Sequence, residues 1–234
     1  MEPRLQKIIF TLLSVLPDGV VIDAGANNGH DSKLLARTAT NRTVLSVEPL
    51  RSNLRRIETI AAHFPNMRVV AGGLGAQPGE SSYGASADQP GVWPRGQTGV
   101  LDFYKRNEAH DEERVPFTIH TIDDLVGEQR LALAHLDVEG SEMDALRGGS
   151  RVIGRDKPVL TVETFPTYRA DAHAALQSYL QSIGYRTYVI PEPCGSHGCR
   201  NMLCIPDGAP APVTDAVERL SRYIVPPGRL KETL

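Results

Sequence analysis

Acidic residues that follow apolar segments are the groups in this chain best placed to do chemistry. The apolar segment 20–22 leads directly into Asp23, and Gly25 and Gly29 come next. Glycine lets a backbone turn sharply and approach a ligand closely, and open α/β sheets bind ligands beyond the carboxyl ends of their strands. A dinucleotide turn requires G-x-G-x-x-G, which this spacing lacks. We therefore predict a nucleotide-type site here, but not a dinucleotide site.

The acidic residues of the first two predicted strands narrow the choice of ligand. Asp23 would repel a pyrophosphate but attract an ammonium group, directly or through water, such as the one that S-adenosylmethionine carries. Glu48 ends the next apolar segment, where a carboxylate can bridge both hydroxyls of a ribose. Each has a structural alternative: Asp23 could cap amides of a tight turn, and Glu48 could favour the dipole of the helix after Pro49.

Two more carboxylates, Asp137 and Glu139, end a later apolar segment. Their alternate spacing places them on the same side of the chain if the strand continues that far. They could orient a cofactor and an acceptor, or accept a hydroxyl proton. Glu139 could equally be structural, because Ser141 and Asp144 resemble a capping box at the start of a helix.

The candidates for a general base are, in order of preference, Asp137, Glu139, His120 and Glu163. Asp123 and Asp124 are left out of the site, because the pattern Thr121-x-x-Asp124 predicts a helix cap. These two aspartates are therefore expected to be structural.

The three cysteines lie between positions 194 and 204. Cys194, His197, Cys199 and Cys204 could suggest zinc, but their spacing is irregular, and the apolar surroundings of Cys204 favour a buried thiol. Three cysteines are also too few for a disulfide framework, which fits a reducing compartment. A metal that activates a hydroxyl would recruit Asp137, yet the sequence offers no clear third ligand. We therefore expect no metal site.

Short apolar segments alternate with amphipathic ones, which predicts a doubly wound α/β domain with a mostly parallel sheet. Connection 72–99 is long and rich in glycine, serine and proline, and 100–104 and 115–122 read as extended, so we expect a β excursion there. The predicted strands are 19–23, 43–47, 67–71, 131–137 and 158–163, with a closing hairpin of 185–190 and 202–205. The predicted helices are 5–16, 31–38, 52–63, 141–147 and 171–183.

The length and charge of the chain limit its domain number and the kinds of partner it can bind. The chain has 234 residues and a net charge of -3, with no long basic run, so we expect one domain and no nucleic-acid partner. The first predicted helix is too short to span a bilayer, so we expect no membrane partner and a cytoplasmic location. The sequence does not indicate an oligomeric state.

The acidic motifs together resemble those of the FkbM methyltransferases, most specifically in the G-A-N-x-G turn and the D-x-E-G-x-E run. The matching segments, in order, are Val21-Ile22-Asp23-Ala24-Gly25-Ala26-Asn27-Asn28-Gly29, Val47-Glu48-Pro49, 119–125, Leu136-Asp137-Val138-Glu139-Gly140-Ser141-Glu142, 146–149, 158–163, Gly184-Tyr185 and Asn201-Met202-Leu203. The resemblance implies a class I methyltransferase fold with a Rossmann-like, seven-stranded sheet. It also implies S-adenosylmethionine as donor and commonly a hydroxyl of a sugar or natural product as acceptor.

The expected site residues fall into a donor-binding group and a catalytic group. The residues expected to contact the donor are Asp23, Ala24, Gly25, Ala26, Asn27, Gly29, Glu48, Pro49, Gly73 and Asp137. Those expected to act in catalysis are Asp137, Glu139 and His120. We expect an N-terminal helix in 1–17, a methyltransferase domain in 18–206 with an inserted loop and hairpin in 72–116 that could form a lid, and an extension in 207–234. The alternative function is a noncatalytic module that binds the cofactor or a protein.

Overall fold

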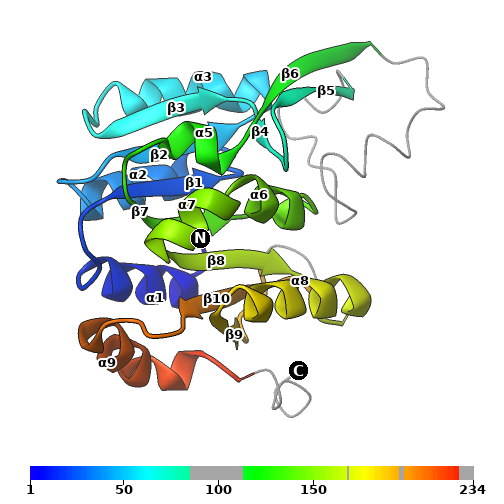
Figure 1. The fold of residues 1–234 in the computed structure, drawn as a ribbon. Helices are drawn as coiled ribbons and strands as arrows, with labels where there is room; N and C mark the ends of the chain where they lie inside the picture. The colour runs from blue at the N-terminus through cyan, green and yellow to red at the C-terminus, as the bar shows by residue number, and fades with distance from the viewer. Residues whose placement is uncertain (85–112, 168, 195–197, 227–234) are drawn as a thin grey trace.

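The computed structural model describes residues 1–84, 113–167, 169–194 and 198–226 (Figure 1). The predicted extended segment 100–104, most of connection 72–99 and His197 lie outside the described residues. Figure 1 shows the strands of one large sheet stacked from β3 at the top to β9 and β10 at the bottom.

The large sheet has seven strands in the order β3-β2-β1-β7-β8-β10-β9. Its strands are β1 Val20–Ala24, β2 Val44–Glu48, β3 Met67–Ala71, β7 Leu131–Leu136, β8 Val159–Thr164, β9 Tyr185–Ile190 and β10 Arg200–Pro206. Only β10 runs antiparallel to its neighbours, β8 and β9. The predicted doubly wound, mostly parallel sheet is therefore confirmed.

Strand β1 lies where the strand order reverses, with β2 on one side and β7 on the other. Every residue of β1, β2, β7 and β8 is buried, because helices cover both faces of a parallel sheet. A reversal of this kind opens a crevice beyond the carboxyl ends of the strands, where such sheets bind ligands. We therefore expect a ligand site at the carboxyl ends of β1, β2 and β7.

Alternating side chains of the strands build two separate cores. On the first face, Val21, Leu133 and Leu203 pack against buried residues of four helices. On the second face, Ile22, Ala134 and Met202 pack against buried residues of four other helices. The first face is covered by α1 Pro3–Leu13, α2 His30–Thr38, α3 Arg51–Ala61 and α9 Ala211–Arg219. The second is covered by α5 Ile122–Val126, α6 Glu142–Gly148, α7 Ser150–Asp156 and α8 Ala170–Ser182.

Helix α1 carries the apolar spacing that the sequence displays near its start. It buries Leu5, Ile8, Ile9, Leu12 and Leu13 against the first face, as an amphipathic helix docked on a sheet should. No helix among the described residues has the length and apolar character needed to cross a bilayer.

A second, smaller sheet joins β4 Gly73–Leu74, β6 Arg114–His120 and β5 Gly79–Gly84, in that order. Strand β6 is shorter than predicted, because Thr121 caps α5: its Oγ1 accepts a hydrogen bond from Asp124 N at 3.1 Å. The predicted cap is therefore confirmed. Asp123 is also structural, since its Oδ1 accepts a bond from Val152 N at 2.8 Å in the first turn of α7.

Candidate functional site

The glycine turn after β1 is bonded to the end of β2. Gly25 N and Ala26 N both donate to Val47 O, at 3.0 and 3.1 Å. Gly25 has a φ of 83°, and a Cβ at this position would overlap the carbonyl oxygen of Asp137. Only glycine satisfies both constraints. The predicted donor turn and the first predicted base therefore touch through their backbones.

Asp23 is buried within the first core, with 1% of its surface exposed, and its Oδ2 accepts a hydrogen bond from Ser32 Oγ at 2.5 Å. Burial raises its pKa to about 7, which the bond from Ser32 partly offsets. Its neighbour in β7, His135, supplies no positive charge, because burial lowers the pKa of that imidazole to about 4. A ligand would therefore meet Asp23 through a water or an intervening group.

Asp31, in the first turn of α2, is a candidate that the sequence did not reveal. Its Oδ2 lies 2.5 Å from the α-ammonium nitrogen of Met1, and its Oδ1 is buried without a hydrogen-bond partner among the described residues. Its charge also contributes to the raised pKa of Asp23. From sequence it is simply an acidic residue that favours a helix start. In space, Asp23 and Asp31 form an acidic pair.

Glu48 is 4% exposed and binds the backbone at both oxygens. Oε2 accepts a bond from Asn27 N at 2.7 Å, and Oε1 accepts one from Leu50 N at 2.9 Å. Asn27 has a φ of 50°, so this bond also holds an unfavourable backbone conformation in place. Glu48 therefore helps to shape the turn, and it places a carboxylate at the end of β2.

Three carboxylates gather beyond β7 and β8. One oxygen each from Asp137, Glu139 and Glu163 lies within 4.8 Å of the other two. Burial, followed by the charges of its neighbours, raises the pKa of Asp137 to about 8 and that of Glu163 well above its ordinary range. Burial also raises the pKa of Glu139. The structure therefore brings the predicted bases Asp137 and Glu139 together with Glu163, the least preferred of the four candidate bases.

The loop that carries Glu139 is held by Glu142, the first residue of α6. Glu142 Oε1 accepts bonds from Val138 N at 3.2 Å and from Gly140 N at 3.0 Å. Ser141 occupies the N-cap position but makes no side-chain capping bond. The predicted capping box is therefore wrong: Glu142 satisfies the loop amides instead. Glu139 itself has a φ of 53°, a strained conformation for a residue other than glycine.

His120 lies on the other side of the site. Its Nε2 is 3.2 Å from Ala71 O, at the end of β3, and a Cβ on Gly72 would contact its ring. Gly72 N in turn donates to Glu48 O at 3.0 Å. Strands β2 and β1 lie between β3 and β7, so His120 is not a member of the carboxylate group. Gly73, the first residue of β4, lies on this same side.

Cys194 and Cys199 form a disulfide that closes the connection between β9 and β10. The sequence leaves the redox state of these cysteines open, and the structure pairs two of them, because strands that run antiparallel bring both ends of their connection together. Cys204 is buried in β10, where burial raises the pKa of its thiol, so it stays neutral. The disulfide leaves Cys194 and Cys199 with no thiolates for zinc. Cys199 Sγ lies 3.0 Å from Glu163 Oε1.

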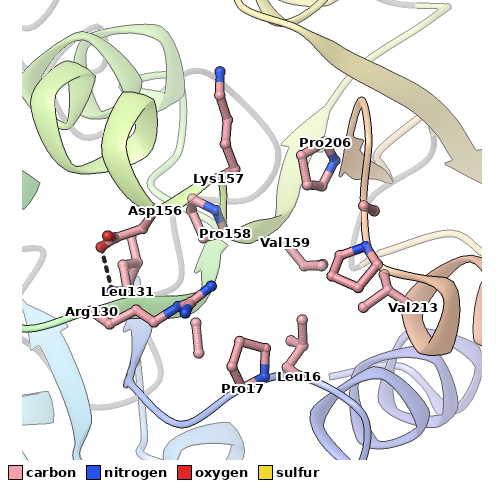
Figure 2. Close-up of a pocket in the computed structure, with 13 residues that line it drawn as sticks. Leu16, Pro17, Arg130, Leu131, Asp156, Lys157, Pro158, Val159, Pro206 and Val213 are labelled. Carbon is pink, nitrogen blue, oxygen red and sulfur yellow. Dashed lines mark hydrogen bonds between the residues drawn. The ribbon is translucent and has the colours of Figure 1, made fainter.

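A separate hollow lies at the opposite end of the strands, as Figure 2 shows. Arg130, Lys157, Pro206 and Val213 surround it, next to the first residues of β7 and β8. Open α/β sheets bind ligands at the carboxyl ends of their strands. This hollow is therefore not the predicted site.

The replacement Asp23→Asn should make the chain more stable at pH 8. The pKa of Asp23 rises from an ordinary 3.8 to about 7 on folding, so between these values the folded state retains a proton that the unfolded state has lost, and the contribution of this residue to stability falls as the pH rises. Asparagine keeps the acceptor for Ser32 but never ionises. We expect a gain of about 1–3 kcal/mol at pH 8 relative to pH 4. Urea denaturation at both pH values measures it, with the exposed Asp215→Asn as control. Equal gains at both pH values would contradict the assignment.

Comparison with known proteins places this geometry in a family. The model of the Methyltransferase FkbM domain matches residues 23–187. The AMB antimetabolite synthetase AmbE of Pseudomonas aeruginosa is 27% identical over 164 residues, which cover 56% of this chain and 8% of that synthetase. The crystal structure of methyltransferase FkbM from Methylobacillus flagellatus KT superposes with a TM-score of 0.57 at 19% identity, covering 80% of this chain and 43% of that one. The chain thus spans less than half of either protein but shares the fold of the second. Since the family match covers most of its length, the chain belongs to the FkbM methyltransferase family.

Proposed function

We propose that this chain transfers a methyl group from S-adenosylmethionine to a hydroxyl oxygen of a small molecule, such as a sugar or a natural product. The observation that carries the proposal is the contact between Gly25 and Asp137. It sets a turn suited to the donor against the backbone of the residue that begins the carboxylate group. Membership of the FkbM family supports the methyl-transfer chemistry.

The residues at the end of β1 and β2 fit the donor. Gly25 lets the turn pack against the backbone of Asp137, where any side chain would clash, and the buried Asp23 would favour the positive charges of a methionine moiety bearing a sulfonium. Glu48 would supply the carboxylate that accepts bonds from the ribose hydroxyls. The bound donor would supply an electrophilic methyl carbon, whose bond to sulfur breaks as the acceptor oxygen forms its bond to that carbon.

The carboxylates beyond β7 would act on the acceptor. Asp137, or Glu139 beside it, would accept the proton that the hydroxyl loses and pass it to solvent. Raised pKa values make both groups better proton acceptors than ordinary carboxylates once they are ionised. Most of the rate enhancement would come from holding the oxygen in line with the methyl group.

Calorimetric titration with S-adenosylmethionine and S-adenosylhomocysteine, followed by radiolabelled methyl transfer to a panel of sugars, polyketides and phenols, tests the proposal. We expect saturable binding of both nucleosides and label on a hydroxylated acceptor. Absence of binding would overturn the proposal. Binding without transfer to any member of the panel would favour a noncatalytic cofactor-binding module.

The replacement Glu48→Gln should weaken donor binding by at least about tenfold, or about 1.4 kcal/mol. The amide nitrogen of glutamine would face one of two backbone donors, Asn27 N or Leu50 N, and could not accept a ribose hydroxyl bond. Glu58→Gln on the exposed side of α3 is the matched control. Calorimetry on both folded variants measures the change, and equal affinities would remove Glu48 from the donor site.

A further inference from the structure

Three neighbouring strands place oxygen-bearing side chains in one row beyond the predicted donor turn. Asp137 follows β7, Glu163 lies in β8 and Asn201 lies in β10. Asn201 is paired directly with Glu163, so their side chains share a face. His135 pairs with Thr161, and Asp137 and Glu163 each follow two residues later, which puts them on that same face.

Two buried acceptors in this row have no hydrogen-bond partner among the described residues. Glu163 is 6% exposed and its Oε2 is unpaired, while Asn201 is 2% exposed and its Oδ1 is unpaired. The other oxygen of Glu163 faces Cys199 Sγ, which leaves Oε2 for the row. Leaving a buried acceptor unpaired destabilises the folded chain. When Glu163 is ionised neither atom can donate a hydrogen bond, so they cannot satisfy each other.

A cation would satisfy both atoms and the adjacent carboxylates together. No described lysine or arginine forms an ion pair with Asp137, Glu139 or Glu163. Their oxygens already lie within 4.8 Å of one another, a separation that one ion can bridge. Carboxylate and amide oxygens are the ligands of hard divalent cations such as Mg²⁺ and Mn²⁺.

We propose that Asp137, Glu139, Glu163 and Asn201 bind a divalent cation of the Mg²⁺ class, which holds the acceptor. The sequence led us to expect no metal, because the third and fourth ligands come from strands remote from Asp137 in the chain. Mg²⁺ takes about six oxygen ligands, so four from the protein leave about two for the acceptor. The acceptor class is then a molecule with two adjacent oxygens, such as a vicinal diol or a hydroxy acid.

This inference rests on the proposed function and deepens it. A hydroxyl oxygen bound to the cation loses its proton at a lower pH than a free one. With the cation bound, Asp137 and Glu139 act as ligands and the proton passes to water, and the oxygen then bonds to the methyl carbon as the carbon–sulfur bond breaks. The electron pair of that broken bond stays on sulfur, so charge and atoms balance.

The test is a titration of the EDTA-treated full chain with Mn²⁺ alone, without donor, in which electron paramagnetic resonance follows the free ion. We expect saturation near about one ion per chain, displaced by Mg²⁺. Asn201→Leu and Glu163→Gln should each weaken Mn²⁺ binding by at least about tenfold. Glu80→Gln, on the exposed part of β5, should leave it unchanged.

Thermal melts without metal show whether each variant is folded. Asn201→Leu and Glu163→Gln each remove an unpaired buried acceptor, so both should melt at or above the temperature of the parent chain. If one fails to fold, the other still decides. Absence of saturable Mn²⁺ binding, or equal binding by a folded Asn201→Leu or Glu163→Gln variant, would overturn the proposal. Donor titration in EDTA separately tests the proposed function, so failure of one is distinguishable from failure of the other.

Discussion

Replacing Asp137 with asparagine should lower kcat for methyl transfer by about 100- to 10,000-fold. Asparagine has the same shape but cannot accept a proton, and it is a weaker cation ligand than a carboxylate. Donor affinity should fall by less than about threefold, because the backbone carbonyl of Asp137, rather than its side chain, contacts the donor turn.

Single-turnover measurements with radiolabelled donor, together with calorimetry, separate the two effects. Asp144→Asn is the matched control, since Asp144 lies on the adjacent helix α6 and pairs at the surface with Arg147 at 3.5 Å. His120→Gln is a second comparison, expected to change kcat far less because His120 lies beside β3. A kcat of Asp137→Asn close to that of the parent chain would remove this residue from the reaction.

The replacement Gly25→Ala should cost stability and abolish measurable donor binding. A left-handed backbone costs a residue other than glycine about 1–2 kcal/mol, and the added methyl group would also displace Asp137 O. The free energy of unfolding should therefore fall by at least about 2 kcal/mol.

Gly154→Ala in helix α7 makes the comparison decisive. Nothing lies within 4 Å of a Cβ added there and its backbone has an ordinary φ, so alanine should be neutral or stabilising by up to about 1 kcal/mol. Urea denaturation and donor titration on both variants provide the measurements. Parent-like donor affinity in Gly25→Ala would show that this turn does not form the donor site.

The sequence predicts most of the sheet because its apolar segments end at acidic residues or glycine. Strand β3 lies at the predicted residues, and β1, β2 and β8 are each displaced by one residue at both ends. Helix α7 was missed, because Gly148 and Gly149 read as a stop, whereas Asp123 caps a new helix directly after them. The local sequence pattern therefore predicts the strands well, but it does not predict a second helix that begins directly after another.

The candidate site could likewise be predicted from the sequence only in part. Asp23 and Glu48 lie in the last residues of apolar strands and Asp137 directly follows one, so their position at the sheet edge could be predicted. The pairing of Asn201 with Glu163 could not, because it depends on β10 lying between β8 and β9. No periodicity within β10 encodes its neighbours. The disulfide depends on the same antiparallel pairing, so the sequence leaves the redox state of Cys194 and Cys199 open.

The position of β10 also sets the order in which a newly made chain can complete its interior. This strand is the last of the sheet to leave the ribosome, yet it lies between two earlier strands. Until it arrives, β8 presents an open edge, which is a hazard for aggregation. A chain released before residue 200 would therefore lack Asn201 and would expose the hydrogen-bonding groups of β8 to other molecules.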